Sequence, residues 1–379
     1  MEGSGTLIYA RPFVANPRAI IGGYTDIEYF NRKNDGTPST FDQHRFVPFW
    51  YADVSDRVKV AVELEIEHGG RGNSQQSGGL DIGLEFMTID YLINEPINLR
   101  TGIILLPLGK FNLLHDAPLR DLTDRPLVDV NIIPAALRQA GAGVYGTFYP
   151  TQLSKLDYEL YVTNGFTGDT INGSAGTRNA RFAPGDDNND GKAVVGRVAF
   201  SPLLGIEVGG SGFYGRYSDN TSREQFLTIT AFDWTLQRGP FEFIGEAAWA
   251  WAPDNRAPGT VASPTNTLTQ DMFGYYAQVN YHFLPTFLTT WAPTFFNPDT
   301  STFTLVLRWD QMDLNTDVDG NFTANRESER LTAGLNFRPL EDSVFKIDLQ
   351  YEPKAIGSIN GVSAPVHETA FVASWATYF

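Results

Sequence analysis

Apolar and polar residues alternate along the segment from residue 57 to residue 68. The apolar residues occupy every second position and are Val58, Val60, Val62, Leu64 and Ile66. The positions between them are mostly charged and hold Lys59, Ala61, Glu63, Glu65 and Glu67. Because successive side chains of a β-strand point to opposite faces, the pattern predicts a strand with one apolar and one ionic face. The apolar face would lie in the core of a soluble sandwich or against lipid in a membrane barrel, so one strand does not decide between them.

The same alternation recurs about sixteen times along the chain. The segments lie at about residues 19–30, 41–52, 57–68, 80–92, 98–106, 138–150, 155–165, 192–201, 205–217, 224–236, 240–251, 271–283, 302–313, 327–338, 344–352 and 366–379. Most are about twice as long as the five or six residues of a typical soluble strand, and a tilted strand of that length crosses a bilayer. An even strand number is typical of single-chain bacterial barrels. The sequence therefore predicts an all-β fold, a transmembrane antiparallel β-barrel, and disfavours a soluble all-β protein.

The predicted connections alternate between short and long. Short turns fall at residues 53–56, 93–97, 151–154, 202–204, 237–239 and 339–343. Longer polar loops fall near residues 31–40, 69–79, 107–137, 166–191, 252–270, 314–326 and 353–365, with a shorter one at 218–223. This asymmetry is typical of outer-membrane barrels. The connection 284–301 departs from it, because it is long and aromatic where a short turn is expected. It predicts a periplasmic helix or plug, or else a wrongly assigned pair of strands.

Composition excludes several classes of protein. The chain is 42% hydrophobic with a mean hydropathy of −0.22, and it has no run approaching the ~18 apolar residues of a membrane helix. It has no cysteine, which excludes disulfides, thiolate zinc sites and cysteine nucleophiles. The net charge of −16 argues against nucleic acid as a partner. Residues 1–18 lack the features of a signal peptide. We expect them to form an N-terminal periplasmic segment before a single barrel domain at 19–379.

The chain ends on alternating aromatic residues. Phe371, Trp375 and Phe379 fall on one face of the last predicted strand. In a soluble protein this would be an open, aggregation-prone edge. In a closed barrel, strand 366–379 would pair with strand 19–30 and its aromatic face would meet lipid. The ending also resembles the C-terminal strand of bacterial outer-membrane barrels, where a terminal Phe is part of the signal read by the insertion machinery.

The longest connection, 107–137, follows the fifth predicted strand and mixes ions with apolar residues. A barrel of about sixteen strands encloses a wide aqueous lumen, and a long third loop folded inward would narrow it. The candidate constriction residues on this loop are His115, Asp116, Arg120, Asp121, Asp124, Arg125 and Asp129. The candidate pore-lining residues on the strands are Lys59, Glu63, Glu65, Arg100, Arg138, Arg197 and Arg308.

Two roles stay open for the charges of this loop. Its aspartates could face wall residues Arg100, Arg138 and Arg197 and set up a transverse field that orients dipolar solutes. Alternatively, Arg120 and Arg125 pair with neighbouring aspartates and only hold the loop shut.

Strand number, alternating connections, long third loop and terminal Phe together resemble the trimeric outer-membrane porins of Gram-negative bacteria. Residues 20–29 and 106–112 resemble the opening strand and the start of the third loop in the phosphate-selective porin-like group of 16-stranded barrels. The resemblance implies an outer-membrane location, a homotrimer, contact with lipid and lipopolysaccharide, and passage of small solutes. It also implies anion selectivity. The sequence departs from this, because acids outnumber bases on the predicted lumen faces, and an acidic lumen favours cations.

Two polar loops carry the first half of a calcium-binding motif. The candidate ligands are Asp186, Asn188 and Asp190 in one loop and Asn315, Asp317 and Asp319 in the other. Neither motif has the closing Glu, and Arg197 stands at that position in the first. Calcium in the outer loops and simple turn formation therefore both stay open, and no other cofactor is expected. The pair His115–Asp116 invites comparison with a hydrolytic dyad, but no serine motif accompanies it, and no enzyme is expected.

The sequence therefore predicts an outer-membrane porin, a passive diffusion channel for small hydrophilic solutes and ions that prefers cations. The alternative is an outer-membrane adhesion or envelope-scaffold barrel whose lumen does not conduct. A TonB-type transporter would need more strands and a plug domain, which residues 1–18 are too short to form.

Overall fold

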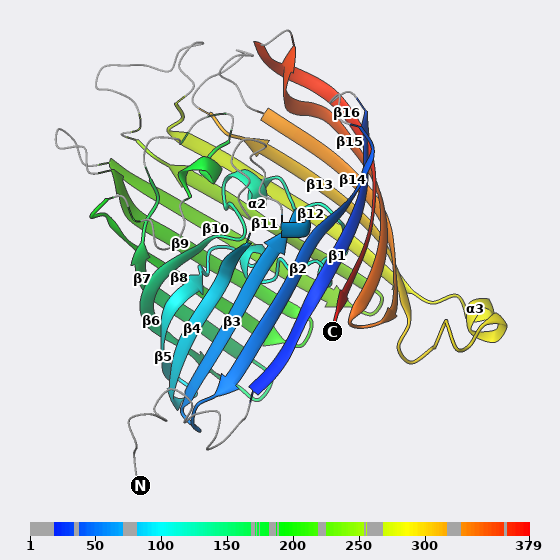
Figure 1. Cartoon of the computed structure of the whole chain (residues 1–379), viewed down its shortest axis with the longest axis horizontal. Coiled ribbons are helices and arrows are strands. Elements are labelled where there is room, and N and C mark those ends of the chain that lie inside the picture. Colours follow the sequence, from blue (N-terminus) through cyan, green and yellow to red (C-terminus); the bar gives the residue numbers. More distant parts are fainter. Residues whose placement is uncertain are drawn as a thin grey trace.

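Sixteen antiparallel strands form a closed barrel in the computed structural model of the chain (Figure 1). The structure describes residues 19–33, 38–70, 82–167, 171, 173, 175–181, 187, 189–218, 225–253, 255, 268–316, 327–359 and 362–379. Each strand pairs with its sequence neighbours, and the last strand pairs with the first. The predicted all-β antiparallel barrel and its strand number are confirmed. The expected N-terminal segment, 1–18, lies outside the described residues.

The strands begin and end close to the predicted positions. They are β1 (Ala19–Lys33), β2 (Thr40–Asp53), β3 (Val58–Glu67), β4 (Ile82–Asn94), β5 (Ile97–Leu105), β6 (Arg138–Phe148), β7 (Lys155–Asn164), β8 (Lys192–Leu203), β9 (Ile206–Ser218), β10 (Gln225–Arg238), β11 (Phe241–Trp251), β12 (Asp271–Phe283), β13 (Thr302–Asp313), β14 (Glu327–Leu340), β15 (Ser343–Ile359) and β16 (Val362–Tyr378). Among the described residues, the α-helices are α2 (Val128–Asn131) and α3 (Thr286–Trp291). In the described part of the chain, no helix has the length and apolarity needed to cross a membrane.

The chain ends seal the barrel. Strand β1 pairs with β16 from Tyr24 opposite Tyr378 to Lys33 opposite Thr369. Phe379 extends this pairing by exchanging two backbone hydrogen bonds with Gly23, at 2.9 and 3.2 Å. The predicted seam between the first and last strands is therefore confirmed.

Alternate residues of each strand divide between the outside of the barrel and its interior. On β15, Ile347 and Leu349 are 51% and 61% exposed, whereas Lys346 and Asp348 between them are buried. The same division separates Leu305 and its apolar neighbours on β13 from the inward-facing ions of that strand. The outer surface is accordingly apolar, as a lipid-facing barrel requires.

One predicted loop is wrong. Residues 353–365 were expected to form a long polar connection, but β15 continues to Ile359 and β16 starts at Val362. Pairs from Ala355 opposite Val366 to Ile359 opposite Val362 continue the ladder beyond an irregularity after Glu352. The sequence Asn-Gly at 360–361 is the strongest short-range signal for a hairpin turn. Pro353 and Pro365 stand on either side of this signal. Because proline cannot donate to the ladder of a sheet, they disfavoured strands there in the prediction.

The aromatic connection 284–301 contains helix α3. None of the helical residues is buried, and the segment projects sideways from the barrel at the end that carries the short turns (Figure 1). The flanking strands β12 and β13 pair along their whole length. The predicted helix is therefore present, whereas a plug and a wrongly assigned pair of strands are both excluded for this segment.

The barrel interior holds an apolar core that the predicted watery lumen did not anticipate. Leu106, Leu108, Val128, Ile132 and Ile133 of the long third connection are fully buried there. They belong to one cluster with inward-facing apolar residues of β10 to β13, among them Leu227, Ile229, Ala248, Ala250, Met272 and Met312. Near the end of the barrel that carries the long loops, these strands therefore have apolar residues on their inner face. Part of the lumen is thus closed by packing.

Candidate functional site

The loop between β5 and β6, residues 106–137, folds into the barrel, with α2 inside the ring of strands (Figure 1). Its two ends are joined where the backbone nitrogen of Leu106 donates to the carbonyl of Leu137 at 3.0 Å. The buried amide of Asn112 donates to the carbonyls of Leu106 and Leu137, and its oxygen accepts from the Leu137 nitrogen at 2.7 Å. Because buried polar groups are costly unless paired, the side chain of Asn112 holds the two ends of the loop together.

On one side the loop is fastened to β9 and β11. The backbone nitrogens of Lys110 and Phe111 donate to one carboxylate oxygen of Glu246, at 2.8 and 3.1 Å, and the nitrogen of Gly109 donates to Ser211. Gly109 has a φ of +71°, and a Cβ added there would lie 2.0 Å from Glu246. The tight approach therefore requires glycine at this position.

On the other side acidic and amide side chains of the wall hold the loop. The carboxylate of Asp348 on β15 accepts from the backbone nitrogen of Thr123 at 2.6 Å, and Asp310 on β13 accepts from Leu127 at 3.1 Å. Gln350 donates to the carboxylate of Asp124 at 2.8 Å. These bonds tie the middle of the loop to β13 and β15.

Basic side chains of the wall donate to backbone carbonyls of the loop. Lys346 binds the carbonyl of Ala117 at 2.7 Å, and Arg338 binds that of Pro118 at the same distance. Arg308 binds the carbonyl of Asp124 at 3.1 Å. Lys346 and Arg308 are almost fully buried. Wall cations thus serve to position the loop, a role that the sequence alone did not assign to them.

The seven candidate constriction residues separate into two groups. Arg120, Asp121 and Asp124 line an open cavity. The remaining four, His115, Asp116, Arg125 and Asp129, make contacts within the packed part of the loop. His115 binds Glu85 of β4, and Asp116 accepts from the hydroxyl of Tyr378 at 2.9 Å.

The two loop arginines do not follow the simpler of the two predicted roles. Arg120 donates to the carbonyl of Thr123 and lies 3.9 Å from Asp26 of β1, and Arg125 donates to the carbonyl of Ala135. Their described contacts are therefore with the loop backbone and the wall, and not with neighbouring loop aspartates.

Two aspartates of the loop differ in charge because their surroundings differ. Burial raises the pKa of Asp124, but the guanidinium groups of Arg32 and Arg330 outweigh burial and bring it to about 2. Burial, together with the carboxylate of Glu246, raises the pKa of Asp129 well above its usual value. At neutral pH Asp124 is therefore ionised, whereas burial favours the protonated, neutral form of Asp129.

Burial, together with the nearby guanidinium groups of Arg45 and Arg120, lowers the pKa of Arg125 to about 9. Burial also raises the pKa of Asp116. Arg125 therefore keeps its charge at neutral pH, whereas burial favours the neutral forms of Asp116 and Asp129.

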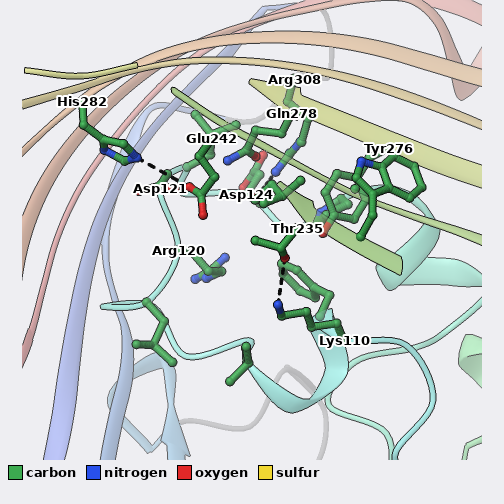
Figure 2. Close-up of a pocket in the computed structure, with 18 residues that line it drawn as sticks. Lys110, Arg120, Asp121, Asp124, Thr235, Glu242, Tyr276, Gln278, His282 and Arg308 are labelled. Atoms are coloured by element: carbon green, nitrogen blue, oxygen red, sulfur yellow. Dashed lines mark hydrogen bonds and ion pairs between the residues drawn. The ribbon is translucent and has the colours of Figure 1, made fainter. Parts of the chain in front are cut away.

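A cavity of about 400 Å³ separates the loop from strands β10 to β13 (Figure 2). The loop contributes apolar side chains to it, namely Phe111, Leu114, Leu119 and Leu122. The strands contribute Thr235, Glu242, Ile244, Tyr276, Gln278, His282 and Arg308. Figure 2 shows Lys110 pointing toward Thr235 and His282 facing Glu242. The Nζ of Lys110 lies 2.8 Å from the Oγ1 of Thr235, and the Nε2 of His282 lies 3.6 Å from the Oε2 of Glu242. The space is thus bounded by apolar surface with ionic groups at its edges.

Most of the candidate pore-lining residues have their charges paired inside the barrel. Arg100 binds Asp90 through two hydrogen bonds of 2.8 Å, and Lys59 lies 2.8 Å from Asp53. Both cations border a second cavity of about 520 Å³ on the side of β2 to β5.

Four of the other five lining candidates, Glu65, Arg138, Arg197 and Arg308, also lie beside a group of opposite charge. Arg197 forms a buried pair with Asp233, and Arg308 binds Asp310 at 2.9 Å. Glu65 accepts from Arg45 at 2.9 Å and lies 3.7 Å from Arg138, whereas Glu63 is buried on β3. The predicted transverse field is therefore weakened, because most wall arginines have an acid beside them.

Several important residues were missed at the sequence level. Glu246 and Asp310, which fasten the loop, and Glu242 and His282, which border the cavity, were not among the candidates. Glu242 and Glu246 are four positions apart on one strand face, so the alternation in β11 could have identified them as inward-facing. Nothing in the sequence indicates that they meet the loop.

The described residues offer one group of potential metal ligands. Oxygens of Asp26 and Glu28 and a ring nitrogen of His44 lie within 4.8 Å of one another. The guanidinium of Arg120, 3.9 Å from Asp26, already supplies positive charge beside the two buried carboxylates. The group is therefore accounted for as part of the ion network of the lumen.

The calcium motifs lie mainly outside the described part of the chain. Asp186, Asn188, Asp317 and Asp319 are not described. Asn315 is buried, and its backbone nitrogen donates to the carboxylate of Asp313 at 2.9 Å. Such a bond is typical of an Asx-turn, and calcium at either loop stays a prediction.

Comparisons with known proteins identify the fold. No protein-family model matches the chain. A protein of Aquifex aeolicus (strain VF5), described as uncharacterized, is 28% identical over 276 residues, which are 70% of this chain and 61% of that protein. The alignment therefore spans less than two thirds of the relative.

Solved structures match over almost the whole chain. The anion-selective porin of Comamonas acidovorans is similar with a TM-score of 0.59 and 10% identity, covering 95% of this chain and 99% of the porin. OprB of Pseudomonas putida gives a TM-score of 0.59 and 9% identity, covering 98% and 96%. The outer-membrane channel DcaP of Acinetobacter baumannii gives 0.56 and 12%, covering 94% and 96%. The chain therefore has the fold of the 16-stranded outer-membrane porins, which confirms the predicted resemblance at the level of fold.

Proposed function

We propose that the protein is an outer-membrane porin through which small hydrophilic solutes diffuse passively. A single relationship carries the proposal: the loop of residues 106–137 is tied to the wall on both sides, yet a cavity of about 400 Å³ stays open between it and strands β10 to β13. A diffusion channel can select solutes by size when an inward loop narrows the lumen of a wide barrel. The solute path would run past Arg120 and Asp121 on the loop and Glu242 and His282 on the wall (Figure 2).

The location follows from the outer surface. Exposed apolar residues cover the outside of a closed barrel, and a closed barrel of strands is one of the two architectures that satisfy all backbone groups in lipid. The C-terminal aromatic residues Phe371, Trp375 and Phe379 lie on this outer face. Porin-like structures from several Gram-negative bacteria support the same location, the outer membrane, with lipid and lipopolysaccharide as neighbours.

The selectivity we propose is a weak preference for cations. Asp121, Asp124 and Glu242 border the cavity together with Lys110, Arg120 and Arg308, so the two signs are nearly balanced there. Of these, Arg308 is paired with Asp310. The net charge of −16 gives the whole protein a negative field, and such a field raises the local concentration of cations.

We also propose that the protein is a homotrimer and has no enzymatic role. Trimerisation is supported by the similarity to porin folds, one of which is described as a trimer form. The pair His115–Asp116 is not arranged as a hydrolytic dyad, because His115 binds Glu85 and Asp116 binds Tyr378.

Conductance in a planar bilayer tests the proposal directly. The purified protein should form channels, and its absence of cysteine allows one reactive thiol to be placed in the path. Leu119 is 49% exposed and lines the cavity. Leu119→Cys should lose conductance when a bulky thiol reagent is added, whereas Leu349→Cys, on the outer face, should not change. A folded protein without conductance would instead support the envelope-scaffold alternative.

A further inference from the structure

The connection between β12 and β13 is an uncharged aromatic segment on the outside of the barrel. From Phe283 to Pro298 the chain contains no Lys, Arg, His, Asp or Glu. Phe287, Trp291 and Phe295 are 69%, 77% and 57% exposed. Large apolar side chains presented together in this way mark an interaction surface.

The segment is built as a definite structure. The backbone nitrogen of Ala292 donates to the carbonyl of Leu288 at 2.9 Å and closes α3. The hydroxyl of Ser301, almost fully buried, donates to the carbonyl of Pro339 at 3.1 Å and fastens the end of the segment to β14. Phe287 and Trp291 are four residues apart in the helix and therefore share one face.

The aromatic side chains continue the outer face of the barrel. Phe296 contacts Phe303 of β13 and Phe337 of β14, with ring centroids 6.0 and 5.3 Å apart, and Phe295 also contacts Phe337. Phe303 in turn contacts Phe283 of β12 at 5.8 Å. Further along the same rim, Tyr281 and Phe241 are in ring contact. The segment thus extends an aromatic girdle that runs across four strands, β11 to β14.

We propose that α3 and the residues after it lie in the membrane interface, where they anchor this edge of the barrel to the phospholipid leaflet at the short-turn end. The inference rests on the proposed membrane location. Aromatic residues prefer the boundary between head groups and acyl chains, and an apolar helix face binds in the plane of that boundary. The occupant is lipid because the girdle from which the segment continues already faces lipid, and because the segment lacks charges that would keep it in water.

The segment also projects sideways from the barrel wall (Figure 1). This places the aromatic residues where the leaflet surrounds the barrel, away from the mouth of the lumen. A segment that served as a plug would have to turn in the opposite direction.

Spin-label accessibility in phospholipid vesicles tests this placement. Because the chain has no cysteine, one nitroxide can be attached to the full-length protein at Phe287→Cys, with Thr290→Cys as a second position if the first variant does not fold. Leu349→Cys, on the outer face of β15, is the lipid reference, and Glu341→Cys, in the exposed turn after β14, is the water reference. Folding of each variant is checked by heat-dependent electrophoretic mobility.

The measured quantity is the ratio of the label's collision rate with oxygen to its collision rate with a water-soluble nickel chelate. This ratio should be severalfold higher for the label on α3 than for the label at position 341. If the label on α3 instead behaves like the label at 341 while position 349 is lipid-like, the inference is overturned and the membrane barrel stands. A water-like signal at position 349 would overturn both. A label on α3 that is shielded from both reagents and shows spin–spin broadening would assign the segment to contact with a second copy of the chain, which also overturns the inference.

Discussion

The carboxylate of Asp348 on β15 accepts a hydrogen bond of 2.6 Å from the backbone nitrogen of Thr123, 225 residues earlier in the chain. Asp348 is fully buried, so this bond is made without competition from water. It is one of the points at which the barrel wall fixes the loop inside the lumen. The position of the loop, and with it the width of the proposed pore, depends on such bonds.

Removal of this bond should loosen the loop. Hydrogen bonds to charged groups contribute about 1.5–3 kcal/mol, so Asp348→Ala should lower the free energy of unfolding by about that amount and increase the conductance noise of single channels. Unfolding in denaturant and single-channel recording measure the two effects. Asp157→Ala on β7 is a suitable control, because Asp157 faces Thr147 and Lys155 and does not contact the loop. Equal noise in both variants would remove Asp348 from loop positioning.

Gly109 should tolerate no side chain. A Cβ at this position meets the buried carboxylate of Glu246, and the φ of +71° strains any other residue. Gly109→Ala should destabilise the protein by about 2–4 kcal/mol, the sum of backbone strain and steric overlap. Gly239 also has a positive φ, of +60°, but nothing lies within 4 Å of its Cβ position. Gly239→Ala should therefore show the strain alone, and a similar loss in both variants would contradict the close packing of Gly109 on Glu246.

Asp124 and Asp129 should respond differently to the loss of their charge. The pKa of Asp124 is about 2 in the folded protein, below its unfolded value, so its contribution is present above about pH 4 and is lost as the pH falls through 2. Asp124→Asn should therefore reduce the free energy of unfolding by about 2 kcal/mol at pH 7 and by almost nothing at pH 2. Chemical unfolding followed by tryptophan fluorescence at both values measures this difference.

Asp129→Asn is the matched comparison. Because burial raises the pKa of Asp129 well above its usual value and so favours its neutral form, the neutral amide should be tolerated with little change in stability. A loss at pH 7 as large as that of Asp124→Asn would show that Asp129 is ionised in the folded protein.

Charges at the edges of the cavity should set ion preference in opposite directions. Glu242→Gln removes a negative charge and should reduce the ratio of cation to anion permeability, whereas Lys110→Gln removes a positive charge and should raise it. The reversal potential in a salt gradient measures both. Glu341→Gln, in an exposed turn, controls for the change in net charge. If the two cavity variants shift the potential in the same direction, solutes do not pass this cavity.

The barrel architecture could be predicted from the sequence because the alternation of a strand is visible in its own residues. The alternation of Phe345, Ile347 and Leu349 with Lys346 and Asp348 is visible without any partner strand, and the observed faces follow it. The long hairpin beyond residue 352 was missed, since Pro353 and Pro365 concealed the Asn-Gly turn signal between them.

The site was predictable only in part. That the third loop is long and carries ions could be read from the sequence, but the identity of its partners could not. Glu246, Asp310 and Asp348 look like ordinary inward-facing acids of their strands. They acquire their role from contact with loop residues far away in the chain.

The sequence by itself determined the number of strands, the faces they turn outward and the loop that is long enough to fold inward. All three follow from the period of two along a strand and from chain length. Only the tertiary structure decided which charges remain free, where the cavity lies and that part of the lumen is an apolar core. These depend on pairings across the barrel, such as Arg197 with Asp233 and Arg308 with Asp310. Burial and long-range pairing set the electrostatics of the interior, and neither is encoded in the local pattern of residues.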